Sequence, residues 1–300
     1  MTKHSIGIDL GGTFIKSGIV DSKGKILKEF KIESCSGISP KKVIEQIEKS
    51  VGYLKNNFSK KISGIGIGAP GVARNGKVYY PPNFKNWKIV DLKKEFSRKY
   101  KTKVQVDNDA NCAAVAELKF GAGKRFKNFL FLTLGTGIGG GIVIDGKLYR
   151  GEFNGAGEFG MTTINFKGPE FPGGNPGAVE AYIGRNYFLK NQKDLIKPLG
   201  KKIDFDEITK LASKGNKTAK EFFKRYGFYL GVGLTNYFNL MDVHTAILSG
   251  GISNAYNFFI DECNKTIKER SLPTIKKNFK VLCSKINNNA GVLGAASLIL

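Results

Sequence analysis

The sequence has few of the residues that build metal sites and disulfide frameworks. Only four cysteines and two histidines occur among its 300 residues. The cysteines (Cys35, Cys112, Cys263 and Cys283) are far apart and form no C-x-x-C pair. This pattern excludes a zinc-type ligand cluster and a disulfide scaffold, and it favours a reducing compartment. His244 lies in an apolar run, residues 243–248, and is expected to be a core residue rather than a ligand.

Long apolar segments are also missing. The longest candidate membrane stretch, residues 291–300, is far shorter than the roughly 20 residues of a transmembrane helix. The amino terminus reaches Asp9 and a glycine pair too early for a signal peptide. We therefore expect a soluble, cytoplasmic protein that does not contact membranes.

Arginine is scarce although the chain is strongly basic. The net charge is +23, but only seven of the 48 basic residues are arginines, and no basic run exceeds a pair. Arginine usually carries bidentate recognition of phosphates and bases, so this pattern favours a solvated lysine surface over nucleic-acid binding. A positive field still favours anionic ligands such as nucleotides. With 41% hydrophobic and 24% charged residues, the chain is globular.

A cluster of acidic and amide residues is the strongest candidate for chemistry. Val104 and Val106 have strand spacing, residues 112–118 have a helical pattern, and Asp107-Asn108-Asp109-x-Asn111 lies between them. Open α/β sheets bind ligands at such strand ends, and a carboxylate there can accept a proton from a substrate. The alternative is that Asp107 or Asn108 only caps the helix.

A strand, a glycine turn and a second strand occur twice. Residues 5–10, Gly11-Gly12-Thr13 and residues 14–20 are followed by a turn and a strand at 25–32. Residues 129–134, a glycine-rich turn at 135–141, residues 142–144 and a turn into 148–149 repeat this plan. Ser249-Gly250-Gly251 adds a third turn after a strand at 245–248. The repeat predicts two related domains whose glycine turns bind a polyphosphate, whereas each turn taken singly is also compatible with an ordinary hairpin.

The other predicted elements connect these motifs. We expect helices at 40–58, 91–100 and 290–300, and helices beginning near residues 180, 204, 216 and 254. We also expect strands at 62–67 and 162–166, with a tight loop from Gly68 to Gly71 and an irregular, aromatic-rich segment at 81–87.

Taken together, these motifs resemble the ROK family of sugar kinases over essentially the whole chain. The resemblance implies an α/β fold of the actin-like ATPase type (hexokinase-type, ribonuclease H-like), with two related domains around a cleft. We expect a small domain at 1–118, against which residues 290–300 pack, and a large domain at 119–289. A homodimer is also implied.

The resemblance assigns a role to each motif. Asp109 is the expected base, with Asp107 as its competitor. The sugar would contact Gly68, Asn83, Asn108, Asp109, Glu158, Met161 and Glu180. The nucleotide, ATP with Mg²⁺, would contact Asp9, Gly11, Gly12, Thr13, Gly135, Thr136, Gly137, Gly250 and Gly251. Asp9 would orient the Mg²⁺, directly or through water.

The family's structural zinc site is not kept. Its histidine position is Met161, and its three cysteine positions are Phe171, Gly173 and Ala178, although Gly174, Gly177 and Glu180 are retained. We therefore expect no zinc. Zinc-less members of the family include N-acetylmannosamine kinases, whereas glucokinases more often keep the site, so the resemblance implies phosphorylation of N-acetylmannosamine at its 6-hydroxyl. The alternatives are a glucokinase and a sugar-binding transcriptional regulator, although Asp9 begins the first phosphate motif too early for a preceding DNA-binding domain.

Overall fold

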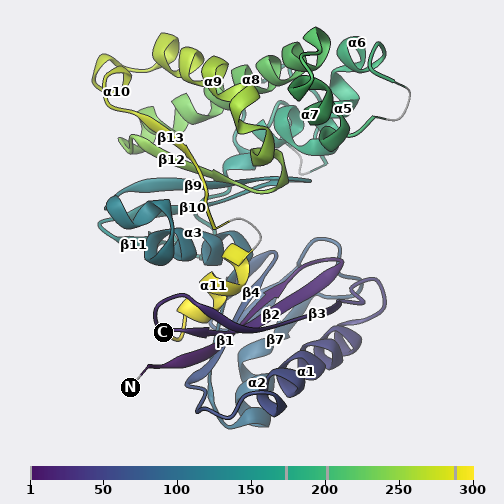
Figure 1. Cartoon of the computed structure of the whole chain (residues 1–300), viewed down its shortest axis with the longest axis vertical. Coiled ribbons are helices and arrows are strands. Elements are labelled where there is room, and N and C mark those ends of the chain that lie inside the picture. Colours follow the sequence, from purple (N-terminus) through teal and green to yellow (C-terminus); the bar gives the residue numbers. More distant parts are fainter. Residues whose placement is uncertain (1, 173–174, 201–202, 287–288) are drawn as a thin grey trace. The chain divides into compact units, whose positions relative to one another are not determined.

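The chain forms two compact units, each built from more than one stretch of sequence. The computed structural model describes residues 2–172, 175–200, 203–286 and 289–300. Unit 1 contains Met1–Lys127, Gly141–Ala156 and Lys285–Leu300, and unit 2 contains Asn128–Gly140 and Gly157–Ser284 (Figure 1). The domain limits expected from the sequence, 1–118 and 119–289, stay a prediction.

The main sheet of unit 1 brings three strand ends to one edge. Its strand order is β3-β2-β1-β4-β8, with bounds β1 (His4–Leu10), β2 (Phe14–Asp21), β3 (Ile26–Glu33), β4 (Gly64–Ala69) and β8 (Lys103–Asn108). β1 and β4 are parallel, as are β4 and β8, and the register pairs Asp9 with Gly68 and Gly68 with Asp107. Asp9 and Asp107 therefore lie at the carboxyl edge of the sheet, one strand apart.

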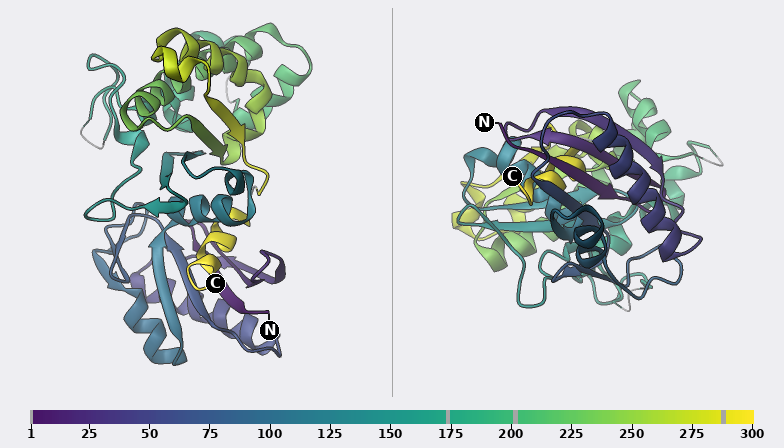
Figure 2. Two further views of the ribbon diagram at one scale, coloured as in Figure 1. Left: turned by 90° about the vertical axis from the view of Figure 1, so that its left-hand side faces the viewer. Right: turned by 90° about the horizontal axis from the view of Figure 1, so that it is seen from below.

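Alternating isoleucine and glycine determine what covers each face of this sheet. Ile6, Ile8, Ile65 and Ile67 are buried in one cluster with the apolar stripe of α1 (Pro40–Asn56). The opposite face carries the glycines Gly7 and Gly66, against which α11 (Ala290–Ser297) packs at close range (Figure 2). A Cβ atom on Gly66 would lie 1.7 Å from the Ala295 carbonyl oxygen. The period-2 pattern of the strands thus allows α11 to pack directly on their backbone.

Unit 1 contains two further α-helices and a small sheet. Helix α2 (Leu92–Tyr100) precedes β8, and α3 (Asp109–Phe120) follows it and packs against α11. A small antiparallel sheet contains β5 (Val72–Arg74), β6 (Lys77–Tyr79) and β7 (Ile89–Asp91). The connection between β6 and β7, residues 80–88, is irregular as predicted, and Trp87 is buried in it.

The second sheet repeats the topology of the first. Its order is β11-β10-β9-β12-β13, with bounds β9 (Phe129–Leu134), β10 (Ile138–Ile144), β11 (Lys147–Tyr149), β12 (Thr245–Ser249) and β13 (Lys280–Cys283). β12 runs parallel to both β9 and β13, as β4 does to β1 and β8. The internal repeat read from the sequence is therefore present in the strand order.

The helices of unit 2 enclose an aromatic core. Helix α8 (Lys217–Met241) packs along α9 (Tyr256–Arg270). Phe188, Phe205, Phe222 and Tyr226 are fully buried and contact one another through their rings. Phe205 begins α7 (Phe205–Ser213), which has the capping box formed by Asp204 and Glu207. The remaining short helices are α4 (Val179–Ile183), α5 (Arg185–Asn191), α6 (Lys193–Ile196) and α10 (Pro273–Lys276).

Three local predictions were wrong. Residues 162–166 form no strand, and only an isolated bridge joins Thr163 to Ala178. The glycine turn predicted at 135–141 is shorter, because β10 already begins at Ile138 and pairing within the sheet outweighs the turn preference of its glycines. His244 is not a core residue: its side chain is 26% exposed and its Nε2 lies 2.8 Å from a carboxylate oxygen of Asp242.

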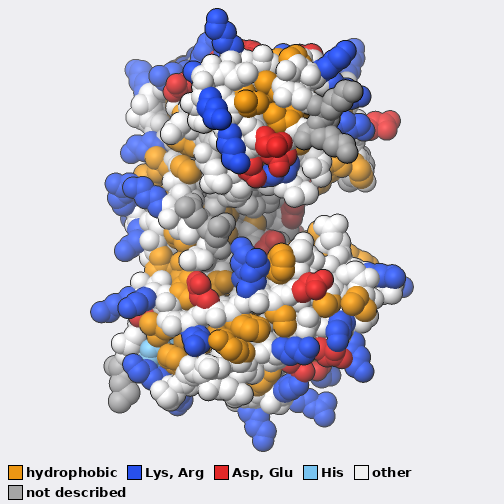
Figure 3. Space-filling view, turned by 45° about the vertical axis from the view of Figure 1, so that its right-hand side comes forward, with side chains coloured by type: hydrophobic (Ala, Val, Ile, Leu, Met, Phe, Trp, Pro, Cys, Tyr) orange, Lys and Arg blue, Asp and Glu red, His pale blue; other side chains and the backbone are white. Residues whose placement is uncertain are grey.

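Surface charge and helix length agree with the composition. Lysine and arginine side chains are scattered over the face shown in Figure 3, with no single dense patch. Within the part of the chain that the structure describes, no helix combines the length and the apolar character that a membrane crossing requires.

Candidate functional site

The acidic stretch lies at the end of β8 and the start of α3, as the sequence predicted. Asn108 is the N-cap: its Oδ1 accepts from the backbone N–H groups of Ala110 (2.9 Å) and Asn111 (3.1 Å). Its Nδ2 donates to the carbonyl oxygen of Gly71 at 3.0 Å. The helix cap that the sequence left open is therefore Asn108, and its side chain also fixes the loop after β4.

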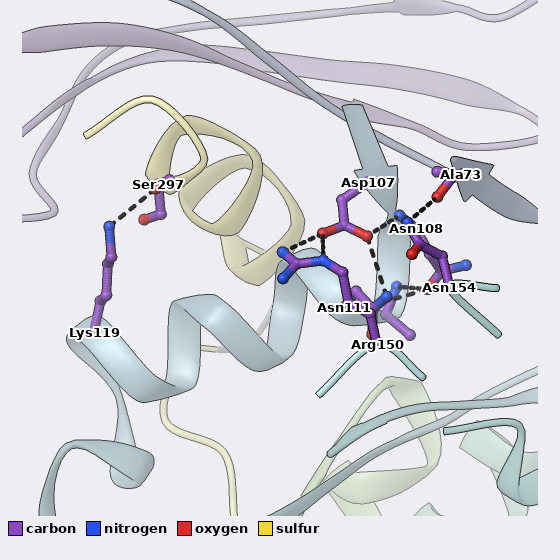
Figure 4. Close-up of polar contacts among 9 residues, drawn as sticks. Ala73, Asp107, Asn108, Asn111, Lys119, Arg150, Asn154 and Ser297 are labelled. Carbon is purple, nitrogen blue, oxygen red and sulfur yellow. Dashed lines mark hydrogen bonds and ion pairs between the residues drawn. The ribbon is translucent and has the colours of Figure 1, made fainter. Parts of the chain in front are cut away.

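Asp107 is held by an ion pair in which two donors of Arg150 bind one carboxylate oxygen. Arg150 donates from Nε (2.9 Å) and Nη2 (2.7 Å) to Asp107 Oδ2 (Figure 4). Asp107 Oδ1 accepts from the backbone N–H of Asn108 (2.8 Å) and from Asn111 Nδ2 (3.1 Å). The Asp107 side chain is only 4% exposed. Both oxygens of the Asp107 carboxylate therefore already accept hydrogen bonds from protein donors, which leaves them less available to a substrate hydroxyl.

The surroundings of Asp109 and Asp9 differ from those of Asp107. Burial raises the pKa of Asp109, against hydrogen bonds from the Ala110 and Asp109 backbone N–H groups and from Asn108. Burial, together with the negative charge of Asp109, raises the pKa of Asp9 from 3.8 to about 6, although Lys16 lowers it. Both carboxyl groups are therefore poised to gain a proton or a cation.

The first glycine turn lies in the same unit. Gly12 and Thr13 are exposed, and the Gly12 carbonyl accepts from the hydroxyls of Ser34 (2.7 Å) and Ser36 (2.6 Å). Asn83 has left-handed backbone (φ 66°), and its Cβ lies 3.7 Å from the position of a Cβ on Gly12. The fold thus brings Asn83 to the turn, although 70 residues separate them.

Gly68 has a packing role. A Cβ atom there would lie 3.1 Å from Cys112 Sγ and 3.6 Å from the Cα of Asp109. The absence of a side chain lets the first turn of α3 approach β4. Contact between Gly68 and a sugar stays a prediction.

The second glycine turn, Gly135–Gly137, is attached to Glu180. Glu180 Oε2 accepts from the backbone N–H of Ile138 at 2.7 Å, and a Cβ atom on Gly137 would lie 2.8 Å from that oxygen. Burial raises the pKa of Glu180, partly offset by this hydrogen bond. The third turn follows the neighbouring strand, because the register pairs Ser249 of β12 with Thr133 of β9. Gly250 has φ 87°, and a Cβ there would lie 2.4 Å from the Leu134 carbonyl oxygen, so only glycine fits.

Met161, Phe171 and Ala178 occupy positions at which the family has zinc ligands. Hydrogen bonds hold the described part of the loop that contains them. Asn175 Nδ2 donates to the Met161 carbonyl oxygen, and its Oδ1 accepts from Thr163 Oγ1 at 2.7 Å. Phe171 contacts the ring of Tyr187, and Ala178 is fully buried. Gly173 and Gly174 lie outside the described residues. Among the described residues, no group of three or more His, Cys, Asp and Glu side chains is arranged to hold a metal ion.

The predicted residues divide between the two units. Unit 1 carries Asp9, Gly11, Gly12, Thr13, Gly68, Asn83, Asp107, Asn108 and Asp109, and unit 2 carries Gly135, Thr136, Gly137, Glu158, Met161, Glu180, Gly250 and Gly251. Glu158 is exposed and precedes the short turn that contains Met161. Sequence reasoning missed Arg150, Asn175 and Arg185. A buried carboxylate is expected to pair with a cation such as arginine, but no spacing in the sequence identifies which arginine it would be.

Comparison with known proteins gives a consistent picture. The ROK family model matches residues 5–300. The chain is 32% identical to a xylose repressor of Bacillus spizizenii, over 99% of this chain and 77% of the relative. It is 31% identical to a glucokinase of Streptomyces coelicolor, over 98% of this chain and 96% of the relative. Relatives of this chain thus include both enzymes and regulators.

Solved structures agree with the predicted fold. A ROK family glucokinase from Streptomyces griseus, in complex with glucose and AMPPNP, has a TM-score of 0.83 and 29% identity over 99% of both chains. A candidate N-acetylmannosamine kinase from Listeria monocytogenes has a TM-score of 0.81 and 27% identity over 99% of this chain and 98% of that one. The predicted α/β fold of the actin-like ATPase type, with two domains, is confirmed.

Proposed function

The chain belongs to the ROK family, and from this premise we propose that it is an ATP-dependent sugar 6-kinase. The observation that carries the proposal is the contrast between two aspartates that are two residues apart. Asp107 is bound by Arg150 through two hydrogen bonds, whereas Asp109 has no ion pair among the described residues and a raised pKa. A sugar sensor needs no such proton acceptor, but a kinase does.

In the proposed reaction Asp109 acts as the general base. It accepts the proton of the sugar 6-hydroxyl while that oxygen bonds to the γ-phosphorus of ATP, and the bond from that phosphorus to the bridging oxygen of ADP breaks. Phosphoryl transfer asks the protein mainly for positioning and charge neutralisation. Arg150 contributes indirectly, because it fixes Asp107, which in turn holds the backbone of Asn108 and the side chain of Asn111.

The residues present fit a nucleotide with its Mg²⁺. Asp9 offers carboxylate oxygens, the ligands that Mg²⁺ prefers, and its pKa of about 6 marks a site where a cation is favourable. We propose that Asp9 holds the ion, directly or through water, and that the nucleotide contacts Gly11, Gly12, Thr13, Gly135, Thr136, Gly137, Gly250 and Gly251. When bound, Mg²⁺ would neutralise negative charge on the phosphates.

For the sugar we propose N-acetylmannosamine. Asn83, Asn108, Glu158 and Glu180 would bind its hydroxyls, and Met161 would lie near its first two carbons in place of a metal-bound histidine. A flexible methionine can cover the N-acetyl methyl, which is worth roughly 1 kcal/mol, or about fivefold in kcat/KM. The expected homodimer, the cytoplasmic location and the absence of zinc stay predictions.

A sugar-binding regulator is the second candidate, because the xylose repressor of Bacillus spizizenii is as similar to this chain as the glucokinases are. A coupled ADP-release assay with glucose, N-acetylglucosamine, N-acetylmannosamine, fructose and xylose separates the alternatives. We expect turnover, with the highest kcat/KM on N-acetylmannosamine. Preference for glucose by tenfold or more would make the protein a zinc-less glucokinase. Sugar binding in calorimetry without ADP release would leave the regulator.

A further inference from the structure

Arg185 is attached to the second glycine turn by its backbone. Its N–H donates to the Gly135 carbonyl oxygen at 3.0 Å, and a Cβ atom on the preceding Gly184 would lie 3.1 Å from the Thr136 carbonyl oxygen. Glu180, on the same segment, binds the N–H of Ile138 at the other end of the turn. These contacts fix the Cα of Arg185 beside residues 135–137.

The side chain of Arg185 extends from there to the third glycine turn. A Cβ atom on Gly251 would lie 3.2 Å from Arg185 Nη2, so the guanidinium lies against the backbone of that glycine. One face of the guanidinium covers the ring of Phe205, with 5.6 Å between the guanidinium carbon and the ring centroid. The backbone of Arg185 is therefore bound to the second turn and its guanidinium lies against the third, and these two turns follow the adjacent strands β9 and β12.

Arg185 has no carboxylate partner among the described residues. By contrast, Arg150 pairs with Asp107 and Arg225 pairs with Asp194. A half-buried guanidinium that stacks on a phenylalanine has lost part of its hydration, and an anion would restore favourable interactions. Its planar set of donors matches phosphate oxygens, and the neighbouring glycines allow a ligand to approach the backbone.

We propose that Arg185 binds the phosphate chain of the nucleotide, donating from its guanidinium to a phosphate oxygen between the two glycine turns. This inference rests on the proposed kinase function and adds a charged phosphate ligand to its glycine turns. The side chain would thus recognise the phosphates rather than the adenine or the ribose.

Calorimetric titration with Mg-ADP and with adenosine tests the proposal on wild type, Arg185→Gln, Arg185→Lys and Arg270→Gln. Arg270 is the matched control, since it also covers a phenylalanine, Phe228, at 5.6 Å in the same unit. One charge-assisted contact corresponds to about 10- to 100-fold in affinity. We expect Arg185→Gln to weaken Mg-ADP binding by that factor and adenosine binding by less than threefold. Arg185→Lys should be intermediate and Arg270→Gln unchanged.

Each other outcome has a distinct meaning. Equal weakening of Mg-ADP and adenosine, or wild-type affinity of Arg185→Gln for Mg-ADP, overturns the role of Arg185 and leaves the kinase proposal intact. A wild-type protein that binds no Mg-ADP and releases none with any sugar overturns both.

Chemical modification of the wild type covers the case in which the variants do not fold. Phenylglyoxal reacts with accessible guanidinium groups, and peptide mass spectrometry locates the modified arginines. We expect Mg-ADP, but not adenosine, to protect Arg185 at least fivefold while Arg270 reacts equally in all samples. Equal protection by both ligands, or none by Mg-ADP, contradicts the inference.

Discussion

Replacing each of the two aspartates by asparagine separates the proposed base from its neighbour. Asp109→Asn keeps the shape of the side chain and one oxygen that can still accept from the Ala110 N–H, a bond of 2.8 Å in the wild type. It removes the proton acceptor, so kcat should fall by about 10²- to 10⁴-fold while sugar binding changes little. Asp107→Asn keeps Asp109, and its kcat should fall less.

Stability should respond in the opposite order. Burial raises the folded-state pKa of Asp109 above its unfolded value near 3.8. Its contribution to stability is therefore present below pH 3.8 and is lost as the pH rises through the folded-state pKa. At pH 7.5 a neutral asparagine avoids that loss, so Asp109→Asn should be at least as stable as the wild type, and its advantage should shrink toward pH 4.

Asp107→Asn places an amide against two guanidinium donors. Loss of charge-assisted hydrogen bonds costs about 1.5–3 kcal/mol when buried. Because the Arg150 side chain is 39% exposed, we expect a loss of about 1–2 kcal/mol in the free energy of unfolding. Arg150→Gln should cost a similar amount, and the double variant should show a coupling energy of about 1 kcal/mol.

The assays are ADP release at saturating sugar and Mg-ATP, and urea unfolding of the protein without ligands. The assignment of Asp109 as the base fails if Asp107→Asn is the more damaging change for kcat while its stability stays at the wild-type level. Asp107 would then be the base, and its contact with Arg150 would serve the reaction rather than the fold.

Three further predictions concern the pH dependence of the reaction, the absence of zinc and the packing of α11. The acidic limb of kcat/KM should have its midpoint above pH 3.8, the ordinary pKa of an aspartate carboxyl, because Asp109 must lose its proton and burial raises its pKa; a midpoint at or below pH 3.8 would contradict this. Elemental analysis should find no zinc, given Met161 at the histidine position, and a chelator should leave the Tm of the nucleotide-free protein unchanged; one zinc per chain would overturn the expectation. Gly66→Ala should lose about 1–3 kcal/mol of stability, because the new methyl group would collide with the backbone of Ala295. Gly52→Ala, which has open space around it in α1, should gain about 0.5–1 kcal/mol. Equal effects of the two substitutions in thermal unfolding would contradict the packing of α11 on β4.

Much of the fold was predictable because local chemistry and tertiary packing agree. The isoleucine–glycine alternation in β1 and β4 places side chains on one face and bare backbone on the other. The caps at Ser39, Asn108, Asp204 and Asn216 mark four helix starts. Where the two disagreed, the sequence was misleading. The glycines after Ile138 favour a turn locally, but pairing within the sheet draws them into β10.

The site was predictable only where its residues are neighbours in sequence. The sequence alone shows the cluster of Asp107, Asn108 and Asp109, because they follow one another at a predicted strand end. Arg150 lies 43 residues from the carboxylate it binds, and Arg185 is 50 residues beyond the turn that fixes its backbone. Seven arginines were available for each role, and no local pattern separates them. Such long-range contacts depend on the tertiary fold, and the hydrophobic periodicity of the sequence contains no information about them.

The repeated topology explains how one plan supports two kinds of chemistry. Both sheets have the same strand order, and each has glycine-containing turns at the carboxyl ends of its parallel strands. In unit 1 that edge carries Asp9, with Asp109 just beyond it, which suit a cation and a proton, while Asp107 at the same edge binds Arg150. In unit 2 the corresponding edge carries Gly250, Gly251 and the guanidinium of Arg185, which suit an anion. We therefore propose that the repeat determines where a ligand approaches the backbone, and that a few charged side chains determine which charge that ligand carries.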